Sequence, residues 1–194
     1  MKIGVLALQG AFIEHIRILQ KLGVEPSEVR LPQDLEALDG LIIPGGESTT
    51  IGKLAVMYGF INPLQQFAGE KPVWGTCAGM ILMAKRIDSD QPLLGVMDIV
   101  VQRNAFGRQQ ESFEEDLFVP VLEEGDQKPF RGVFIRSPKL LTVSGKAREI
   151  ARLSDGTPVA ALENRLLATA FHPELTNDTR FHQFFLRLIR SARR

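Results

Sequence analysis

Apolar runs and helical repeats alternate along the first half of the chain. Residues 2–8 form a short aliphatic run, typical of a strand buried on both faces, and similar runs return at 41–43 and 72–75. Apolar side chains at helical spacing follow each run, over residues 12–19, 51–58 and 80–83. Repeated alternation of strand and helix predicts a mostly parallel sheet covered by helices.

The pattern changes between about Leu93 and His172, where short strand-like runs are separated by polar turns. These runs span residues 95–101, 117–121, 132–135, 158–162 and 166–171. Residues 104–116 are polar and without period, which indicates a surface loop near the site that the sheet carries. We therefore expect a three-layer α/β fold, in which helices flank a mostly parallel central sheet, with an additional mixed or antiparallel strand region. No repeat or linker divides the chain, so we expect a single domain over residues 1–194.

Composition and charge narrow the classes of function. The 194 residues carry 23 Lys and Arg against 23 Asp and Glu, so no net field draws the chain to nucleic acid or to an anionic membrane. The single cysteine excludes a disulfide scaffold and any zinc motif built on a cysteine pair. The first apolar run is too short for a signal peptide, and no later run is long enough to span a bilayer. We expect a cytoplasmic protein that needs no metal and no cofactor.

The most specific local signal is residues 75–79 (GTCAG), where Cys77 stands between two glycines at a strand-to-helix junction. Small flanking residues let the chain turn sharply and project the central side chain away from the sheet, which is the geometry of a nucleophile elbow. Unpaired N–H groups at a helix amino terminus also stabilise a thiolate. The spacing favours a catalytic cysteine over a buried structural one, which free cysteines often are.

A thiolate nucleophile needs a histidine to carry its proton and a third group to orient that histidine. His15 and His182 fall in predicted helices among charged and polar neighbours, so we interpret both as solvated helix-face residues. His172 instead ends an apolar run, where a parallel sheet usually presents its active site. Pro173 fixes the backbone after it, so Glu174 can turn its carboxylate back to the ring. For this segment alone, an exposed turn with an incidental acid stays an open alternative.

Residues 44–50 (PGGESTT) place a glycine pair between a predicted strand and a predicted helix. The glycines let backbone N–H groups approach a substrate, and with the N–H of Ala78 this loop could supply an oxyanion hole. It could equally bind a phosphate, although it lacks the Gly-Lys-Ser/Thr pattern of a P-loop. A third reading is a helix cap, in which Ser48 or Thr49 bonds the first free amides. The pattern alone leaves all three open.

Taken in order, the segments 44–48 (PGGES), 75–79 (GTCAG) and 172–174 (HPE) resemble the class I, triad-type glutamine amidotransferases. Within that class the chain is similar to the glutaminase subunits of pyridoxal 5′-phosphate synthases. The narrower resemblance extends from Leu8 to Thr176. It rests on residues 8–11 (LQGA), 103–109 (RNAFGRQ), 134–138 (FIRSP) and 171–176 (FHPELT).

The resemblance implies hydrolysis of L-glutamine to L-glutamate and ammonia. By this resemblance Cys77 attacks the side-chain amide to form a thioester, His172 serves as base and then acid, and Glu174 orients His172. It also implies that glutamine is contacted by Gly46, Glu47, Ser48, Arg103, Ile135 and Arg136. The choice of arginine also has a physical reason that does not depend on the resemblance. A guanidinium binds an α-carboxylate through two parallel hydrogen bonds.

Ammonia released into water at neutral pH is mostly protonated, and the resulting ammonium ion is not a nucleophile. The chemistry therefore demands a channel to a second active site, and the chain is too short to hold a synthase domain as well. The resemblance implies a hetero-oligomeric complex with the synthase subunit, which builds pyridoxal 5′-phosphate from ammonia, a pentose phosphate and a triose phosphate. It also implies that Gln9 lies at that interface and helps to assemble the oxyanion hole when the partner docks.

Three alternatives stay open. The PfpI-type intracellular peptidases also combine an elbow cysteine with a histidine on a similar sheet, but they do not need residues that bind glutamine. A non-catalytic binding subunit with a relict site is a second alternative, and the complete set Cys77, His172 and Glu174 argues against it. A third is an amidotransferase subunit that serves another synthase.

Overall fold

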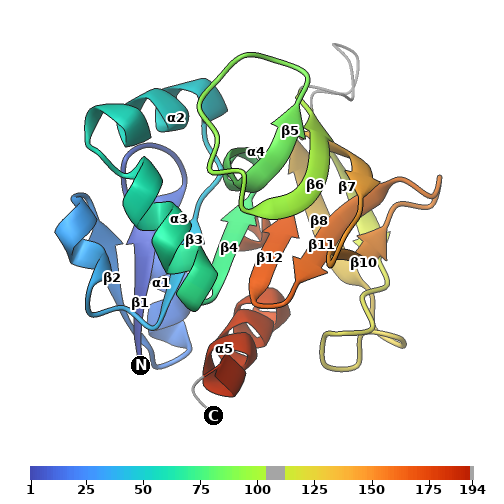
Figure 1. The fold of residues 1–194 in the computed structure, drawn as a ribbon. Helices are drawn as coiled ribbons and strands as arrows, with labels where there is room; N and C mark the ends of the chain where they lie inside the picture. The colour runs from blue at the N-terminus through green and yellow to red at the C-terminus, as the bar shows by residue number, and fades with distance from the viewer. Residues whose placement is uncertain (104–111, 193–194) are drawn as a thin grey trace.

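A seven-stranded sheet forms the centre of the molecule, with strands in the order β10-β11-β12-β4-β3-β1-β2 (Figure 1). The structure is a computed structural model that describes residues 1–103 and 112–192. Five strands are parallel: β1 (Lys2–Leu6), β2 (Glu25–Val29), β3 (Gly40–Ile43), β4 (Val73–Thr76) and β12 (Leu166–Thr169). The antiparallel strands β11 (Pro158–Glu163) and β10 (Arg148–Arg152) extend the sheet at one edge. The expected mostly parallel sheet is confirmed.

Helices cover both faces of this sheet and complete the three expected layers (Figure 1). The helices α1 (Phe12–Lys21) and α5 (Arg180–Ala192) share one face, where Trp74 of β4 stacks on Phe181 with ring centroids 6.2 Å apart. On the opposite face α3 (Ile61–Glu70) crosses in front of the sheet, beside α2 (Ser48–Met57). The short helix α4 (Ala78–Met83) follows β4 directly. No helix in the described part of the chain is long and apolar enough to cross a membrane.

The predicted mixed region is present as two small sheets. The first contains β5 (Ala84–Ile87), β6 (Met97–Gln102) and β9 (Lys139–Val143), and the second pairs β7 (Ser112–Leu117) with β8 (Phe130–Ile135). The expected strand over 117–121 is wrong, because the strand ends at Leu117 and Pro120 follows without an N–H to donate. The expected loop over 104–116 is wrong at its end, where 112–116 form β7. Its remaining residues, 104–111, lie outside the described part.

Pairing across β7 and β8 explains why a polar stretch forms a strand. Phe113 stacks on Phe134 with centroids 4.4 Å apart, and Arg131 lies 3.0 Å from carboxylate oxygens of both Glu114 and Asp116. These cross-strand contacts stabilise the hairpin although its sequence shows little apolar alternation.

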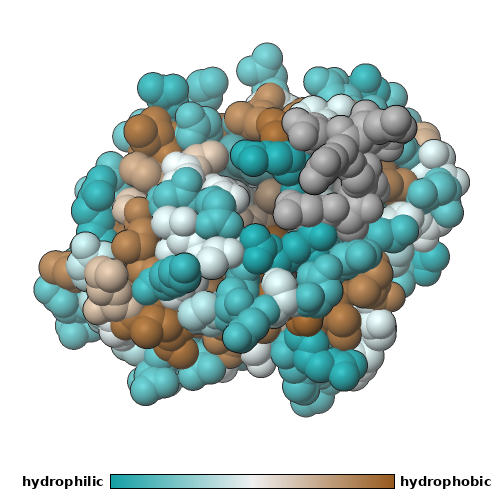
Figure 2. Space-filling view, turned by 90° about the horizontal axis from the view of Figure 1, so that it is seen from above, coloured by the Kyte–Doolittle hydropathy of each residue, from teal (hydrophilic) through white to brown (hydrophobic). Residues whose placement is uncertain are grey.

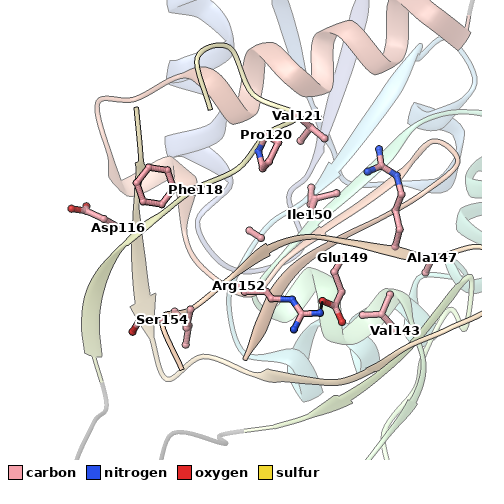
Figure 3. A pocket seen from close by; sticks show the side chains of 13 residues that line it. Asp116, Phe118, Pro120, Val121, Val143, Ala147, Glu149, Ile150, Arg152 and Ser154 are labelled. Atoms are coloured by element: carbon pink, nitrogen blue, oxygen red, sulfur yellow. Dashed lines mark ion pairs between the residues drawn. The ribbon is translucent and has the colours of Figure 1, made fainter. Parts of the chain in front are cut away.

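Both edges of the central sheet are polar strands, which the sequence pattern did not reveal. The edge strand β2 has the sequence EPSEV and is mostly exposed, with Pro26 unable to donate to a further strand. The edge strand β10 carries a bulge between Glu149 and Ala151, and a groove of about 820 Å³ runs along it (Figure 3). Arg152 and Glu149 form an ion pair in this groove. Charge and a bulge protect such an edge from pairing with other chains.

Candidate active site

The carboxyl ends of the parallel strands lie at the upper end of the sheet in Figure 1, and the predicted site residues follow these ends. Cys77 comes directly after β4, and His172 follows β12. Because β4 and β12 are paired neighbours, the topology brings these two residues together. The loop 44–47 follows β3, which pairs with β4 on its other side. Figure 2 looks onto this end of the molecule, where hydrophilic side chains predominate and hydrophobic ones form small separate groups.

Cys77 occupies the elbow that the GTCAG spacing predicts. Its backbone φ of +48° and ψ of −102° lie in a region that side-chain-bearing residues rarely adopt. The flanking glycines permit this turn. A Cβ on Gly75 would lie 2.5 Å from the carbonyl carbon of Gly79, and a Cβ on Gly79 would collide with the backbone oxygen of Ile43. The elbow presents the Cys77 thiol with only 6% of the residue exposed.

His172 and Glu174 lie together behind this thiol. The His172 N–H donates to the backbone oxygen of Val133 at 2.8 Å, which ties the end of the β12 segment to β8. The residues Pro173–Leu175 form a 3-10 turn, and this turn places Glu174 Oε1 2.7 Å from His172 Nδ1. The predicted contact between His172 and Glu174 is therefore present. The second nitrogen of the His172 ring, Nε2, can then form the hydrogen bond with Cys77. A Cβ on Gly45 would lie 2.5 Å from the His172 ring, so only glycine fits beside it.

The surroundings of His172 favour its protonated form. Burial alone would lower the pKa of His172, but its hydrogen bonds to Cys77 and Glu174, and their charges, outweigh burial and raise it to about 10. Burial alone would raise the pKa of Glu174, and the contacts with His15 and His172 outweigh burial and leave it below its ordinary value. At neutral pH the site therefore holds a protonated imidazole against an ionised carboxylate.

A pocket of about 420 Å³ opens beside Cys77 and His172, and a cavity of this size can enclose a small ligand. Glu174 lies behind the His172 ring and is 6% exposed. Every residue that the resemblance implied for glutamine contributes to the pocket wall, namely Gly46, Glu47, Ser48, Arg103, Ile135 and Arg136. The structure thus brings together residues from five separate segments of the sequence.

Glu47 is the charged centre of the glycine loop and caps α2. Its carboxylate accepts hydrogen bonds from the Thr49 N–H at 3.1 Å and from the Thr50 N–H at 2.7 Å. The hydrogen bond from the Thr50 hydroxyl contributes most to lowering the pKa of Glu47 to about 2. The helix-cap reading of this loop placed the cap at Ser48 or Thr49, and the capping residue is Glu47 instead. The Ser48 hydroxyl instead donates to Gln91 Oε1 at 3.0 Å.

Two arginines and a glutamine complete the pocket. Arg103 follows β6, and its Nη2 lies 3.4 Å from Glu47 Oε1. Arg136 follows β8 in a left-handed conformation, with φ of +44°, which is costly for a residue with a side chain. The Gln9 Oε1 atom accepts a hydrogen bond from the Glu47 N–H at 2.8 Å. This contact links the end of β1 to the loop after β3.

The interpretation of His15 and His182 as solvated residues is wrong, because both are completely buried. His15 shares the buried face of α1 with Ile18 and Leu19, at a spacing of three and four residues. His182 is buried on α5 next to Phe181. The helical spacing of His15 was the available signal, but its charged sequence neighbours concealed it. The packing of two helices on one sheet decides the burial of both rings.

An elbow cysteine, a buried histidine with its own carboxylate and a pocket at the carboxyl end of a parallel sheet form the arrangement that is typical of one class of α/β proteins. Members of that class use a cysteine nucleophile held by a triad. Comparisons with known proteins narrow this class.

The profile of the SNO glutamine amidotransferase family matches residues 5–191. A relative from Herpetosiphon aurantiacus, named pyridoxal 5′-phosphate synthase subunit PdxT, is 58% identical over 193 residues, which cover 97% of this chain and 100% of the relative. A protein of the same name from Pelotomaculum thermopropionicum is 55% identical over 188 residues, covering 96% and 94% of the two chains. The chain belongs to the SNO glutamine amidotransferase family, which confirms the resemblance drawn from its motifs.

Solved structures agree with this assignment. A crystal structure of a glutamine amidotransferase superposes with a TM-score of 0.90 at 50% identity and covers 96% of this chain and 98% of its own. A chain in the structure of PurLQS from Thermotoga maritima superposes with a TM-score of 0.73 at 16% identity, covering 96% of this chain and 97% of its own. The second likeness shows the fold alone.

Proposed function

We propose that this protein is a glutaminase that hydrolyses L-glutamine to L-glutamate and ammonia and supplies the ammonia to a pyridoxal 5′-phosphate synthase subunit. The observation that carries the proposal is the Cys77 side chain beside a protonated His172, which is paired with Glu174 at 2.7 Å. Membership of a glutamine amidotransferase family supports the substrate, and relatives named as synthase subunits support the partner. Residues 1–194 act as one glutaminase domain in the cytoplasm, where reducing conditions protect Cys77 from oxidation.

The first half-reaction forms a thioester. The Cys77 sulfur attacks the side-chain carbonyl carbon of glutamine as a thiolate, and backbone N–H groups of Ala78 and the Gly46 loop stabilise the oxyanion. His172 then gives its proton to the amide nitrogen, the C–N bond breaks, and ammonia leaves. Glu174 holds the ring so that Nε2 faces the sulfur, and it stabilises the positive charge on His172.

The second half-reaction hydrolyses the thioester. His172, now neutral, takes a proton from water, and the oxygen of that water attacks the thioester carbonyl. The C–S bond breaks, glutamate leaves with the new oxygen, and the Cys77 sulfur departs as a thiolate facing protonated His172. The site thereby returns to its starting protonation state.

Charge at the pocket wall supports recognition of a free amino acid. Arg103 and Arg136 supply guanidinium groups for the α-carboxylate of glutamine, and Glu47, with its pKa lowered to about 2, supplies an anion for the α-ammonium group. Ser48 and Ile135 complete the wall around the side chain. A peptidase acting inside a polypeptide would have no such pair of charged ends to bind.

Arg103→Ala is expected to raise the KM for glutamine by about tenfold or more, because a hydrogen bond to a charged group is worth about 1.5–3 kcal/mol. Arg103→Lys is the matched control. It keeps the positive charge but cannot form the two parallel hydrogen bonds, so it should restore only part of the affinity for glutamine. Steady-state kinetics of glutamate release measure both. Unchanged kinetics in Arg103→Ala would favour the peptidase alternative instead.

The pH profile of the reaction should follow the protonation of His172. Because the pKa of His172 is raised to about 10 from its ordinary 6.5, the ring stays protonated through neutral pH and loses its proton as pH rises through about 10. We expect kcat/KM for glutamine to fall above that pH. In Glu174→Gln the fall should begin at lower pH, since the ring loses the anion that stabilises its charge. A wild-type decline centred near 6.5 would contradict this assignment.

Gln9→Ala tests the link between partner docking and the oxyanion hole. The Gln9 side chain engages the Glu47 N–H at 2.8 Å, so Gln9 can set the position of the loop that supplies oxyanion donors. We expect the substitution to lower partner-stimulated glutamate release by about tenfold to a hundredfold, the scale of losing part of an oxyanion hole. Rates with and without the synthase subunit measure the effect. Unchanged stimulation would count against a role for Gln9.

Delivery of ammonia to the partner can be tested with an isotope. Glutamine labelled at its amide nitrogen is supplied to the complex together with an excess of unlabelled ammonium, a pentose phosphate and a triose phosphate. We expect the label in the pyridine ring of the product with little dilution, because the nitrogen passes between the sites without mixing with solvent. Dilution to the isotope ratio of the bulk would contradict direct delivery.

A further inference from the structure

Glu174 has a second carboxylate oxygen that the triad does not use. While Oε1 contacts His172, Oε2 is buried and makes no hydrogen bond of standard geometry within the described part of the chain. The ring of His15 on α1 faces this oxygen, and its Nε2 lies 3.4 Å from Oε2 and 3.4 Å from the hydroxyl oxygen of Thr76. Both side chains are completely shielded from solvent. A buried carboxylate oxygen in this position is costly unless an N–H points at it.

The contact continues beyond His15 into the core. His15 Nδ1 lies 2.9 Å from Nε2 of His182 on α5, which forms the far end of a line running from His172 through Glu174 to His15. Trp74 meets both of these histidine rings edge to face, with centroids 5.6 Å from His15 and 4.9 Å from His182. The indole therefore fixes the planes of the two rings relative to each other.

Matching hydrogen-bond donors with acceptors selects one arrangement of protons on His15 and His182. Burial lowers the pKa of both His15 and His182, so each ring is neutral and carries one proton. If His182 Nε2–H donates to His15 Nδ1, then His15 carries its proton on Nε2, the atom that lies 3.4 Å from both Glu174 Oε2 and the Thr76 hydroxyl.

The opposite arrangement is unfavourable in two ways. It would leave a buried His182 Nδ1–H without an acceptor, since this atom has no hydrogen-bond partner among the described residues. It would also place a His15 lone pair, to which the Thr76 hydroxyl can donate, 3.4 Å from a Glu174 carboxylate oxygen. His182 thus fixes the tautomer of His15, as the acid of a triad fixes the tautomer of its histidine.

We propose that His15 is a positioning residue for Glu174, and that His182 sets the tautomer in which His15 donates to the carboxylate. This inference rests on the proposed function, because it extends the machinery of the same site. His15 keeps Glu174 ionised and stops its rotation, so that Oε1 remains aligned with His172 Nδ1. The line Cys77, His172, Glu174, His15 and His182 connects the pocket with helices α1 and α5.

Variants of His15 distinguish the loss of its N–H donor toward Glu174 from the loss of its packing in the core. His15→Leu removes the donor, and we expect it to lower kcat by about tenfold with little change in the KM for glutamine. His15→Gln places an amide N–H near the position of Nε2 and should restore most of the rate, whereas His15→Asn is too short to reach Glu174 and should not. Equal rates for the Gln and Asn variants, or an unimpaired His15→Leu, would overturn the proposal.

A second readout does not depend on glutamine. Because Cys77 is the single cysteine of the chain, the rate of alkylation by iodoacetamide against pH reports this thiol alone. We expect His15→Leu to move the midpoint of that profile upward by about one pH unit, equivalent to a tenfold change in the ion-pair equilibrium. We expect His15→Gln to reverse the shift. An unchanged midpoint in a folded His15→Leu would overturn the proposal.

Two controls test whether a loss of packing, rather than of the donor, shifts the alkylation midpoint in His15→Leu. Phe181→Leu removes a buried side chain that packs on the same Trp74 but carries no polar atom, so it should cost stability without moving the alkylation midpoint. In a Glu174→Ala background, His15→Leu should have no further effect on the midpoint, and an equal effect in both backgrounds would contradict action through Glu174.

The glutaminase function and the positioning role of His15 can be refuted independently of each other. If the wild type releases no glutamate while the alkylation profile shifts and recovers as described, the glutaminase assignment fails and the positioning role stands. If glutamate release is normal and His15→Leu leaves both kcat and the profile unchanged, only the positioning role fails.

Discussion

Replacing Cys77 with alanine is expected to lower kcat for glutamate release by about 10⁴-fold or more, the scale seen when a triad loses its nucleophile. The residue is the single cysteine of the chain, so no other thiol can take its place. The substitution removes only a sulfur at a site that is 6% exposed and should leave the fold intact. Glutamate release at saturating glutamine measures the loss.

The control for this prediction is the thermal stability of the variant. A melting temperature close to that of the wild type, together with loss of turnover, assigns the effect to chemistry. Retention of more than a tenth of the wild-type kcat would show that glutamine is hydrolysed without a Cys77 thioester.

Gly79→Ala is expected to destabilise the fold by about 3 kcal/mol, because an added Cβ would collide with the backbone oxygen of Ile43. A flexible side chain could move aside, but here the obstacle is the main chain of the neighbouring strand β3. Relief therefore requires a shift of α4 or β3, and either shift displaces the elbow that carries Cys77. Urea denaturation measures the change in the free energy of unfolding.

Gly69→Ala provides a matched control with the opposite sign. Gly69 lies in α3, and an added Cβ there meets nothing within 4 Å. Alanine favours a helix over glycine by up to about 1 kcal/mol, so this variant should be as stable as the wild type or more so. Equal stability of Gly79→Ala and Gly69→Ala would contradict the steric account of the elbow.

Sequence reasoning located the candidate site because its signals are local. The two glycines around Cys77 and the proline between His172 and Glu174 constrain the backbone within a few residues, so spacing alone indicates the geometry. The partnership of β4 with β12 is not local, but alternating strands and helices predict that carboxyl ends of parallel strands meet. The six residues expected at the pocket wall came from the family resemblance and could not be derived from spacing.

The errors arose where tertiary contacts override local pattern. His15 and His182 look solvated beside charged neighbours, yet both rings are buried where α1 and α5 meet over Trp74. The edge strand β2 has a polar sequence and is held by parallel pairing with β1 rather than by apolar alternation. Such features depend on which elements become neighbours, and that information is absent from a short window of sequence.

The measurement that tests the central claim most directly is glutamate release from glutamine by the purified protein, alone and mixed with the synthase subunit. We expect turnover that increases when the subunit is present and is lost in Cys77→Ala under both conditions. Absence of glutamate under both conditions with the wild type would contradict the assignment as a glutaminase.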